Sequence, residues 1–474
     1  MSESGAHILI FPYPAQGHMI PLLDFTHHLA TAGLTITILV TPKNLHLLHP
    51  LLSKHPSIST LVLPFPPHPA IPDGVENTVD LPAGGFRSML HALGQLKSPI
   101  LNWFESHPSP PVAIISDMFL GWIHHLAVEL GIRRYVFYPS GALAISVILS
   151  LWCDMPKRQK SEDENEMIKF SKIPSCPVYP WWQLSPIYRS YIEGDPVSEF
   201  VKDGFRANVA SYGLVINTFS GLERVYLDYL SNELGNDRLW SIGPVLPLDD
   251  VGPVERGGPS EVLSSVVSSW LDACQDHTVV YICFGSQAVL TNKQMKELTL
   301  GLEKSGVKFI LCVKGKTKGH VDDEDYGDIP PGFEDRVAER GLVIKGWAPQ
   351  VLILRHKAIG AFLTHCGWNS TIEGIVAGVP MLAWPMGADQ FANATLLVDE
   401  LKVAIRVCEG DETVLESNDL VKFLGDFTSA KWIEKRAIAK NLSKAAVEAI
   451  GKEGSSFKNL DAFVRHVSEL RFGL

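Results

Sequence analysis

Short apolar segments rich in β-branched residues alternate with helix-length segments along most of the chain, and this alternation constrains the fold more than any other feature. In the first half these apolar segments are residues 7–11, 35–40, 112–116, 135–138 and 213–217. In the second half they are residues 279–284, 308–313, 342–344, 361–364 and 381–384. Strands that alternate with helices form parallel sheets covered by helices on both faces. The sequence therefore predicts an α/β protein made of two doubly wound, Rossmann-like domains that face each other across a cleft.

A segment rich in Pro, Gly and acidic residues separates the two series of apolar runs, and it has almost nothing to bury. The 474 residues are enough for two or three domains. We therefore predict an N-terminal domain over 1–246, a linker over 247–260 and a C-terminal domain over 261–455. Residues 157–166 and 314–328 are charged and poor in aliphatic side chains, so we expect surface loops there.

Composition narrows the range of partners and compartments. The 41 basic and 52 acidic residues give a net charge of −11, which disfavours the clustered basic face that nucleic acid requires. The first apolar run is too short for a signal peptide or a spanning helix, and no basic leader precedes it. Seven scattered cysteines without a CxxC pair favour reduced thiols. We expect a cytoplasmic monomer with no integral membrane segment and no nucleic-acid partner.

Polar residues follow two apolar runs of the first half at the strand ends, where open α/β sheets bind ligands. His18 comes at the start of a helix expected over 22–32 and headed by Pro21, and the helix dipole disfavours imidazolium there. Asp117 follows the run 112–116. If the two strands are neighbours, Asp117 can hydrogen-bond the His18 ring, fix its tautomer and support proton uptake. A helix cap or a satisfied core histidine is the alternative interpretation.

A glycine-containing turn, His365-Cys-Gly-Trp-Asn-Ser370, lies between a strand and a helix expected to begin at Thr371. Backbone N–H groups at a helix N-terminus, together with His365, Asn369 and Ser370, could hold a diphosphate. The alternative is an ordinary capped helix, in which Ser370 is the N-cap and Glu373 completes a capping box.

Residues 347–390 contain a dense series of motifs: Trp347-Ala-Pro-Gln350, His365–Ser370, Glu373, Gly378-Val-Pro380, Trp384-Pro385 and Asp389-Gln390. This series resembles the plant secondary-product glycosyltransferase box of the UDP-sugar glycosyltransferases. The resemblance extends over essentially the whole chain, including the loop at His18, the position of Asp117 and the turn Phe284-Gly-Ser286. Residues 61–66 and 41–44 are similar to the branch that acts on flavonols and hydroxybenzoates.

The resemblance implies the GT-B fold, with an acceptor-binding N-terminal domain, a UDP-sugar-binding C-terminal domain and a last helix within 456–474 that returns to the first domain. It also implies roles for individual residues. Trp347 would stack on uracil, Ala348 would read its edge, and Gln350 and Glu373 would hold the ribose. His365, Asn369, Ser370 and Ser286 would hold the diphosphate, and Trp368, Asp389, Gln390 and Ser140 would contact the sugar.

The chemistry of these residue types agrees with such roles, because a planar base suits an aromatic face and vicinal hydroxyls suit a carboxylate or an amide. By the same resemblance, His18 would deprotonate the acceptor, whose oxygen attacks the anomeric carbon opposite UDP and gives a β-glycoside. Gln390 is the position associated with glucose, so UDP-glucose is the expected donor. We expect no metal and no other cofactor, because a helix N-terminus can stabilise the departing diphosphate.

Other short motifs carry less weight. Asp323-Glu-Asp325 matches a metal-binding DxD pattern, but it lies in an acidic stretch that we interpret as a solvated loop. Gly315-Lys-Thr317 lacks the glycine that a phosphate loop requires five residues earlier. Neither GxSxG nor GxGxxG occurs, which removes support for a hydrolase elbow and for hydride transfer.

The acceptor pocket is expected from loops of the first half, over 81–96, 143–152 and 178–191, together with 386–388. Their aromatic residues and proline suit a flat apolar ligand, although core packing explains them equally well: Pro82, Phe86, Trp152, Trp181, Trp182 and Tyr188. The main hypothesis is an inverting glucosyltransferase that uses UDP-glucose and a flavonoid or simple phenolic hydroxyl. The alternatives are a non-catalytic sugar-nucleotide-binding protein, or the same fold with another UDP-sugar or a terpenoid or hormone acceptor.

Overall fold

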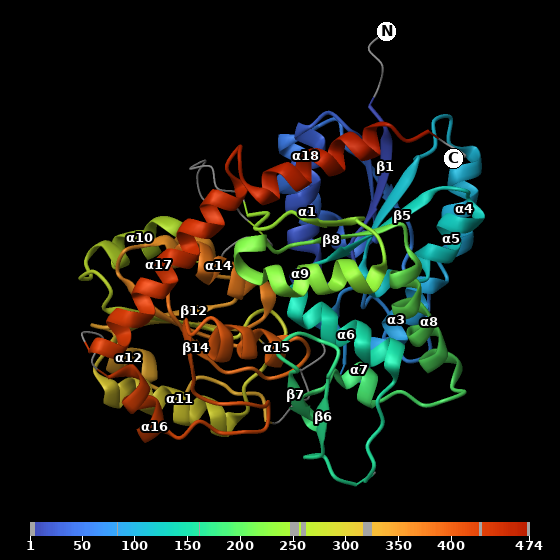
Figure 1. The fold of residues 1–474 in the computed structure, drawn as a ribbon. Coiled ribbons are helices and arrows are strands. Elements are labelled where there is room, and N and C mark those ends of the chain that lie inside the picture. The colour runs from blue at the N-terminus through green and yellow to red at the C-terminus, as the bar shows by residue number, and fades with distance from the viewer. Residues whose placement is uncertain are drawn as a thin grey trace. The chain divides into compact units, whose positions relative to one another are not determined.

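The computed structural model describes residues 5–82, 84–160, 162–246, 256, 262–315, 325–425 and 429–471. The chain divides into two compact units (Figure 1). The first unit comprises Met1–Leu248 and Glu448–Leu474, and the second comprises Asp249–Val447. The predicted linker lies outside the described residues apart from Arg256, and so do Asp323 and Glu324 of the DxD motif.

The first unit is built on a seven-stranded sheet in the order β3-β2-β1-β4-β5-β8-β9, with every neighbouring pair parallel. Two of its strands were not predicted, and both are short strands at the sheet edges, where the sequence pattern is weakest. The strands are β1 (His7–Phe11), β2 (Thr35–Val40), β3 (Ser59–Val62), β4 (Ala113–Asp117), β5 (Arg133–Tyr138), β8 (Gly213–Ile216) and β9 (Leu239–Ser241).

Helices connect these strands, as the parallel topology requires. They are α1 (Gln16–Thr31), α2 (His49–Lys54), α3 (Phe86–Gly94), α4 (Lys97–Ser106), α5 (Ile123–Glu129), α6 (Ala142–Asp154), α7 (Pro186–Arg189), α8 (Pro196–Ala210) and α9 (Ser220–Leu234). A short antiparallel pair, β6 (Met167–Lys169) and β7 (Val178–Pro180), lies outside the main sheet.

Helix α1 begins earlier than predicted. The N–H groups of His18 and Met19 both bond to the Ala15 carbonyl, at 2.9 and 2.8 Å, so the helix is already formed before Pro21. Pro21 therefore lies inside α1 instead of at its head. His18 consequently lies in the first turn of the helix, directly after the carboxyl end of β1.

The last helix, α18 (Ser455–Ser468), packs on the first sheet and runs beside α1 in Figure 1. Phe463 and Val467 are fully buried in the same hydrophobic core as the strands of that sheet. The Tyr135 hydroxyl and His466 Nε2 are 2.7 Å apart, and Asn459 Nδ2 donates to the Ser241 carbonyl at 3.0 Å. The C-terminal segment is therefore an integral part of the first unit.

The second unit has a six-stranded parallel sheet in the order β12-β11-β10-β13-β14-β15. Its strands are β10 (Val279–Cys283), β11 (Lys308–Val313), β12 (Gly341–Lys345), β13 (Ile359–Thr364), β14 (Met381–Ala383) and β15 (Ala404–Arg406). Its α-helices are α10 (Ser264–Asp272), α11 (Asn292–Ser305), α12 (Phe333–Val337), α13 (Gln350–Arg355), α14 (Trp368–Ala377), α15 (Gln390–Thr395), α16 (Ser417–Leu424) and α17 (Ala430–Ile450). The edge strand β15 was not predicted. Two parallel doubly wound sheets confirm the predicted α/β class.

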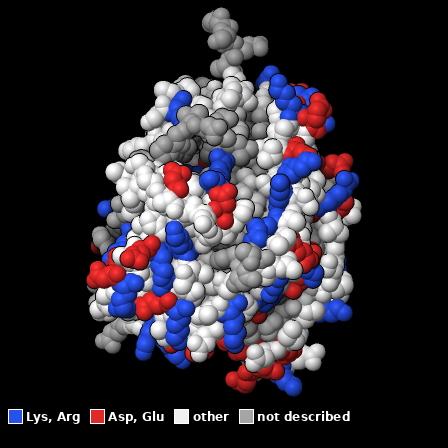
Figure 2. All heavy atoms as spheres, turned by 90° about the vertical axis from the view of Figure 1, so that its left-hand side faces the viewer, with Lys and Arg blue, Asp and Glu red and all other residues white. Residues whose placement is uncertain are grey.

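The surface carries both signs of charge. On the face shown in Figure 2, basic and acidic side chains are interspersed. Exposed ion pairs of this kind include Arg336 with Glu303, at 2.7 Å, and Lys422 with Asp419, at 2.6 Å. None of the helices formed by the described residues is long and apolar enough to cross a membrane.

Candidate active site

The first candidate centre lies where β1 and β4 end side by side in the first sheet. His18 Nδ1 is 2.8 Å from Asp117 Oδ2, so the contact expected between these residues is present. The Asp117 side chain is fully buried, whereas the His18 side chain is 20% exposed. A carboxylate accepts hydrogen bonds, so it favours the tautomer with hydrogen on Nδ1 and leaves Nε2 as the ring's acceptor. Such a histidine can take a proton from a ligand.

The other Asp117 oxygen is also bonded. Oδ1 accepts a hydrogen bond from the Phe119 backbone N–H at 2.9 Å, which fixes the carboxylate plane. Phe119 in turn stacks on the His18 ring, with centroids 4.6 Å apart and an angle of 29° between the planes. The short turn that follows β4 therefore holds both members of the pair.

Aromatic rings surround His18 in the first unit. Tyr13 lies edge-on to His18 at 5.7 Å, and Phe86 contacts Tyr13 and Phe119 at 5.4 and 4.9 Å. Burial, and secondarily the charge of Asp117, raises the pKa of the Tyr13 phenol well above its usual value, so Tyr13 stays neutral. Sequence reasoning singled out Phe86 but missed Tyr13 and Phe119, although each lies within a few residues of a predicted site residue.

Most of the other aromatic residues expected in the acceptor wall are packed inside the first unit. Trp152 is buried and stacks on Phe205 with centroids 4.8 Å apart and planes 7° apart. Tyr188 meets Trp152 edge-on at 5.3 Å, and Trp181 is buried as well. These three therefore favour the core interpretation. Pro82, Phe86 and Trp182 are half-buried and retain accessible surface.

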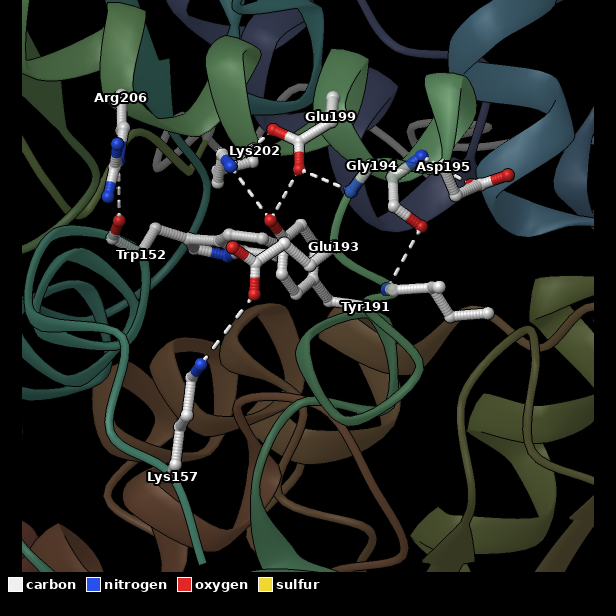
Figure 3. Close-up of polar contacts among 11 residues, drawn as sticks. Trp152, Lys157, Tyr191, Glu193, Gly194, Asp195, Glu199, Lys202 and Arg206 are labelled. Atoms are coloured by element: carbon white, nitrogen blue, oxygen red, sulfur yellow. Dashed lines mark hydrogen bonds and ion pairs between the residues drawn. The ribbon is translucent and has the colours of Figure 1, made fainter.

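The segment that follows these aromatics is anchored to α8 by a polar cluster, shown in Figure 3. The Tyr191 hydroxyl donates to Glu199 at 2.5 Å and accepts from Lys202 at 2.7 Å. Gly194 N–H also donates to Glu199, at 3.1 Å. The hydrogen bonds from Lys202, Tyr191 and Gly194 lower the pKa of Glu199 to about 2, so the cluster is charged at neutral pH.

The second candidate centre is the turn between β13 and α14 in the second unit. Here the expected start of the helix was wrong, and so was the alternative interpretation of Ser370 as the N-cap. The helix begins at Trp368, three residues before Thr371, and its N-cap is Gly367. Gly367 takes the extended N-cap conformation, and its carbonyl accepts the first helical bond, from Thr371 N–H at 2.9 Å. Ser370 is therefore inside the helix and forms no capping box.

This earlier start places Trp368, Asn369 and Ser370 in the first turn of α14. Backbone N–H groups of a first turn have no acceptor within the helix and point toward a bound anion. Ser370 Oγ accepts a hydrogen bond from Gln350 Nε2 at 3.1 Å. Trp368 as a whole is buried, at 3% exposure.

His365 fills the space between two glycines. A Cβ on Gly285 would lie 2.6 Å from the His365 ring, and one on Gly367 would lie 2.4 Å from it, so both positions require glycine. Burial lowers the pKa of His365 to about 4, which keeps the ring neutral at physiological pH. Its buried Nδ1 has no hydrogen-bond partner among the described residues. Ser286 follows Gly285 in the turn after β10.

The residues expected to hold the nucleoside are connected to one another. Gln350 Nε2 donates to Glu373 at 2.8 Å, and the Tyr281 hydroxyl donates to Gln350 Oε1 at 3.1 Å. Glu373 is 5% exposed. Trp347 is half-buried and Ala348 is buried, both in the loop between β12 and α13. Sequence reasoning missed Tyr281, because it reads as an ordinary strand residue.

Arg256 was also missed, because its segment was interpreted as a linker with little to bury. Its guanidinium forms an ion pair with Glu373, and its carbonyl accepts a hydrogen bond from Trp347 Nε1 at 3.0 Å. The only sign of Arg256 in the sequence was that a single arginine lies within a segment rich in proline, glycine and acidic residues. Two residues predicted to bind the nucleoside thus both contact Arg256.

The predicted sugar contacts come from two places. Gln390 Oε1 accepts from the N–H groups of Met386 and Gly387, at 2.8 and 3.0 Å, which leaves Nε2 as the end that can donate to a sugar hydroxyl. Asp389 Oδ2 accepts from Asn393, at 3.1 Å. Ser140 is buried in the first unit, between β5 and α6.

Within the part of the chain that the structure describes, no group of three or more His, Cys, Asp or Glu side chains is arranged to hold a metal ion.

Comparisons with known proteins identify the family. The family model "UDP-glucoronosyl and UDP-glucosyl transferase" matches residues 238–431. UDP-glycosyltransferase 89B2 from Stevia rebaudiana is 60% identical over 98% of this chain and 98% of its own length. Flavonol 3-O-glucosyltransferase UGT89B1 from Arabidopsis thaliana is 55% identical over 98% of this chain and 96% of its own.

Solved structures of related proteins are also similar to this chain. Arabidopsis thaliana UGT89C1 complexed with UDP-L-rhamnose has a TM-score of 0.80 at 38% identity, covering 98% of this chain and 99% of that chain. The same protein complexed with quercetin has a TM-score of 0.79 at 37% identity, covering 98% of this chain and 100% of that chain. These matches confirm the family and the fold that the motifs over 347–390 predicted. The chain belongs to the plant UDP-glycosyltransferases and is a glycosyltransferase of the GT-B fold.

Proposed function

We propose that this enzyme transfers glucose from UDP-glucose to a hydroxyl group of a flavonoid or simple phenolic and forms a β-glucoside. The observation that carries the proposal is the His18–Asp117 hydrogen bond of 2.8 Å, set among Tyr13, Phe86 and Phe119. A base beside aromatic rings suits a flat acceptor that carries an acidic hydroxyl. The relative named as a flavonol 3-O-glucosyltransferase and the structure complexed with quercetin support this acceptor class.

His18 is the proposed general base. With hydrogen on Nδ1 and donated to Asp117, its Nε2 accepts the proton of the acceptor hydroxyl. Asp117 then stabilises the imidazolium that forms, in the manner of the aspartate of a catalytic triad. The acceptor oxygen attacks the anomeric carbon on the side opposite UDP, the bond from that carbon to the diphosphate breaks, and the configuration inverts in one displacement.

The second unit supplies the proposed donor site. Trp347 and Ala348 hold uracil, and Gln350 and Glu373 hold the ribose. Ser286, His365, Asn369, Ser370 and the first-turn N–H groups of α14 receive the diphosphate, and Trp368, Asp389 and Gln390 contact the sugar. Donors already in place stabilise negative charge as it develops on a leaving group. We propose that this arrangement works without a metal ion.

A second donor is favoured by one specific observation, the similarity to a structure complexed with UDP-L-rhamnose. The two donors differ in the sugar hydroxyls that Asp389 and Gln390 would meet. Gln390 supports glucose through the family resemblance, which associates glutamine at this position with that sugar. Its Oε1 is held by backbone N–H groups, so its Nε2 is the end that can donate to a sugar hydroxyl. Donor competition separates the two possibilities.

The test is UDP release with product mass for the purified enzyme, given UDP-glucose, UDP-rhamnose, UDP-galactose and UDP-xylose against flavonols, hydroxybenzoates and terpenoid alcohols. Hexose adducts of phenolics, formed fastest from UDP-glucose and unaffected by EDTA, are expected. Adducts formed from another sugar alone would overturn the donor assignment. UDP binding without any adduct would favour a non-catalytic sugar-nucleotide-binding protein.

A further inference from the structure

Arg134, in β5, is the most deeply buried cation beside the proposed base pair. It is 1% exposed, and each of its three guanidinium nitrogens donates a hydrogen bond. Nε donates to Ser116 Oγ at 2.8 Å and Nη2 to the Asp117 carbonyl at 3.3 Å. Nη1 donates to Asn208 Oδ1 and to Ser211 Oγ, both at 2.9 Å. One side chain therefore connects β4 to the C-terminal end of α8.

Asn208 completes this connection on the other side of Asp117. Its Nδ2 donates to the Met118 carbonyl at 2.8 Å. The backbone at Asp117 and the backbone at Met118 are thus both held, by Arg134 and by Asn208, while Asp117 Oδ1 is held by Phe119 N–H. The carboxylate has one remaining oxygen, and that oxygen contacts His18.

The charges around the pair make Arg134 distinctive. Burial lowers the pKa of Arg134 to about 9, so it remains protonated at neutral pH. Burial raises the pKa of Tyr138, and burial together with Arg134 lowers the pKa of His124. With Tyr13 also neutral, none of these three neighbours carries charge at neutral pH. The groups that face Arg134 and Asp117 are His18 from α1, Tyr13 from the loop after β1, Tyr138 from β5 and His124 from α5, with Asp203 of α8 beside His124.

We propose that Arg134 is a positioning residue for the His18–Asp117 pair. Its hydrogen-bond donors fix the backbone that carries Asp117. Its positive charge lies near the buried carboxylate of Asp117, which must balance the His18 imidazolium during the reaction. Arg134 is buried, so we propose that it acts through the pair and not by contact with the donor or the acceptor. This inference rests on the proposed role of His18 as the base.

Two substitutions separate geometry from charge. Arg134→Lys keeps the charge, but a single ammonium cannot reach four acceptors, so kcat should fall on the order of tenfold with an unchanged pH profile. Arg134→Gln removes the charge and leaves only two N–H donors on a shorter side chain, so Asp117 is less well positioned and kcat should fall about 100-fold. Loss of a nearby cation makes proton uptake by the His18–Asp117 pair easier. The acidic limb of the plot of log kcat/KM against pH should therefore move to higher pH. The acceptor KM should change less than kcat in both variants.

Arg133 offers a matched control, because it is the adjacent residue of the same strand and points to the opposite face. Its guanidinium lies over the Tyr212 ring, 4.2 Å from the ring centroid. Arg133→Gln should leave both kcat and the acidic limb as they are in the native enzyme. If Arg134→Gln does not fold, a comparison of kcat between Arg134→Lys and Arg133→Gln still tests whether the hydrogen bonds of Arg134 position Asp117.

A double-mutant cycle with His18→Ala makes the inference falsifiable. If Arg134 acts through the pair, Arg134→Gln should have almost no further effect on the residual turnover of His18→Ala. An equal loss in both backgrounds, with an unmoved acidic limb, would overturn the positioning role and leave Arg134 as a purely structural residue. If His18→Ala itself retained turnover, the proposed base would fail instead, and the two failures are distinguishable.

Discussion

The two candidate centres differ in how their residues are distributed along the chain. The pair in the first unit joins residues 99 positions apart, and its supports come from three places: the turn after β4, strand β5 and helix α8. Most donor-site residues of the second unit lie within 347–390, on three consecutive βα connections. A centre built from consecutive segments is visible as a motif, whereas a dispersed centre depends on which strands become neighbours.

The centres also differ in how their polar groups are satisfied. In the second unit Glu373, Gln350, Tyr281 and Arg256 bond to one another, so a nucleotide must exchange some of these contacts for its own. In the first unit Asp117 is committed to His18 and to backbone, and the pair has one fixed arrangement. Turnover should therefore be sensitive to changes in the first centre, and nucleotide affinity to changes in the second.

The largest expected effect concerns the first centre alone. His18→Ala should lower kcat by about 10²- to 10⁴-fold, because the acceptor hydroxyl loses its base. The affinity for UDP, measured by calorimetry, should stay at the native value. A parallel loss of UDP affinity would break the separation between the two centres.

The next effect concerns the second centre. Glu373→Gln removes a charged acceptor from the proposed ribose site, which should weaken UDP binding by about 10- to 100-fold. At saturating donor, kcat should stay within a few fold of native, as measured by initial rates. Glu303→Gln is the matched control in the same unit, since Glu303 pairs with Arg336 at the surface and should not affect UDP.

The free energy of unfolding should depend on pH through His365, a residue of the second centre. Because burial lowers the pKa of His365 to about 4, the unfolded chain binds its proton near pH 6.5 while the folded chain does not. This contribution is present above about pH 6.5 and is lost as pH falls toward 4, by about 2 kcal/mol between pH 7 and pH 5. Urea unfolding midpoints of the native enzyme should fall faster with acid than those of His365→Asn. Equal slopes would contradict a neutral, buried His365.

The smallest effect tests Arg256. Arg256→Ala should strengthen UDP binding on the order of two- to fivefold, because the nucleotide then no longer has to displace an ion pair from Glu373. The sign is opposite to that expected for Glu373→Gln, and calorimetry measures both. Weaker binding in Arg256→Ala would mean that Arg256 belongs to the nucleotide site.

The parallel strands and the donor motifs could be predicted because their information is local. Apolar runs rich in β-branched residues, such as 35–40, coincide with strands that are almost entirely buried. The short strands β3, β9 and β15 escaped prediction because edge strands bury less surface and carry a weaker pattern. The start of α14 was misplaced because Ser370 matched the capping pattern, whereas the N-cap is Gly367.

The residues that support the first centre could not be predicted, because their roles arise from tertiary contacts. Arg134 reads as one of two adjacent arginines, and nothing in the sequence shows that it is buried against Ser116 and Asp117. Phe119 and Asn208 are equally ordinary in the sequence. The residues that line the acceptor pocket could not be identified from the sequence either. Aromatic residues such as Trp152 pack in a core as readily as they bind a ligand.

The measurement that tests the central claim most directly is the anomeric configuration of the product formed from UDP-glucose and a flavonol, determined from the proton coupling of the anomeric carbon by NMR. A single displacement activated at His18 predicts the β-glucoside from the α-linked donor, with no product from His18→Ala over the same time. An α-glucoside, or native rates of β-glucoside formation by His18→Ala, would contradict the account.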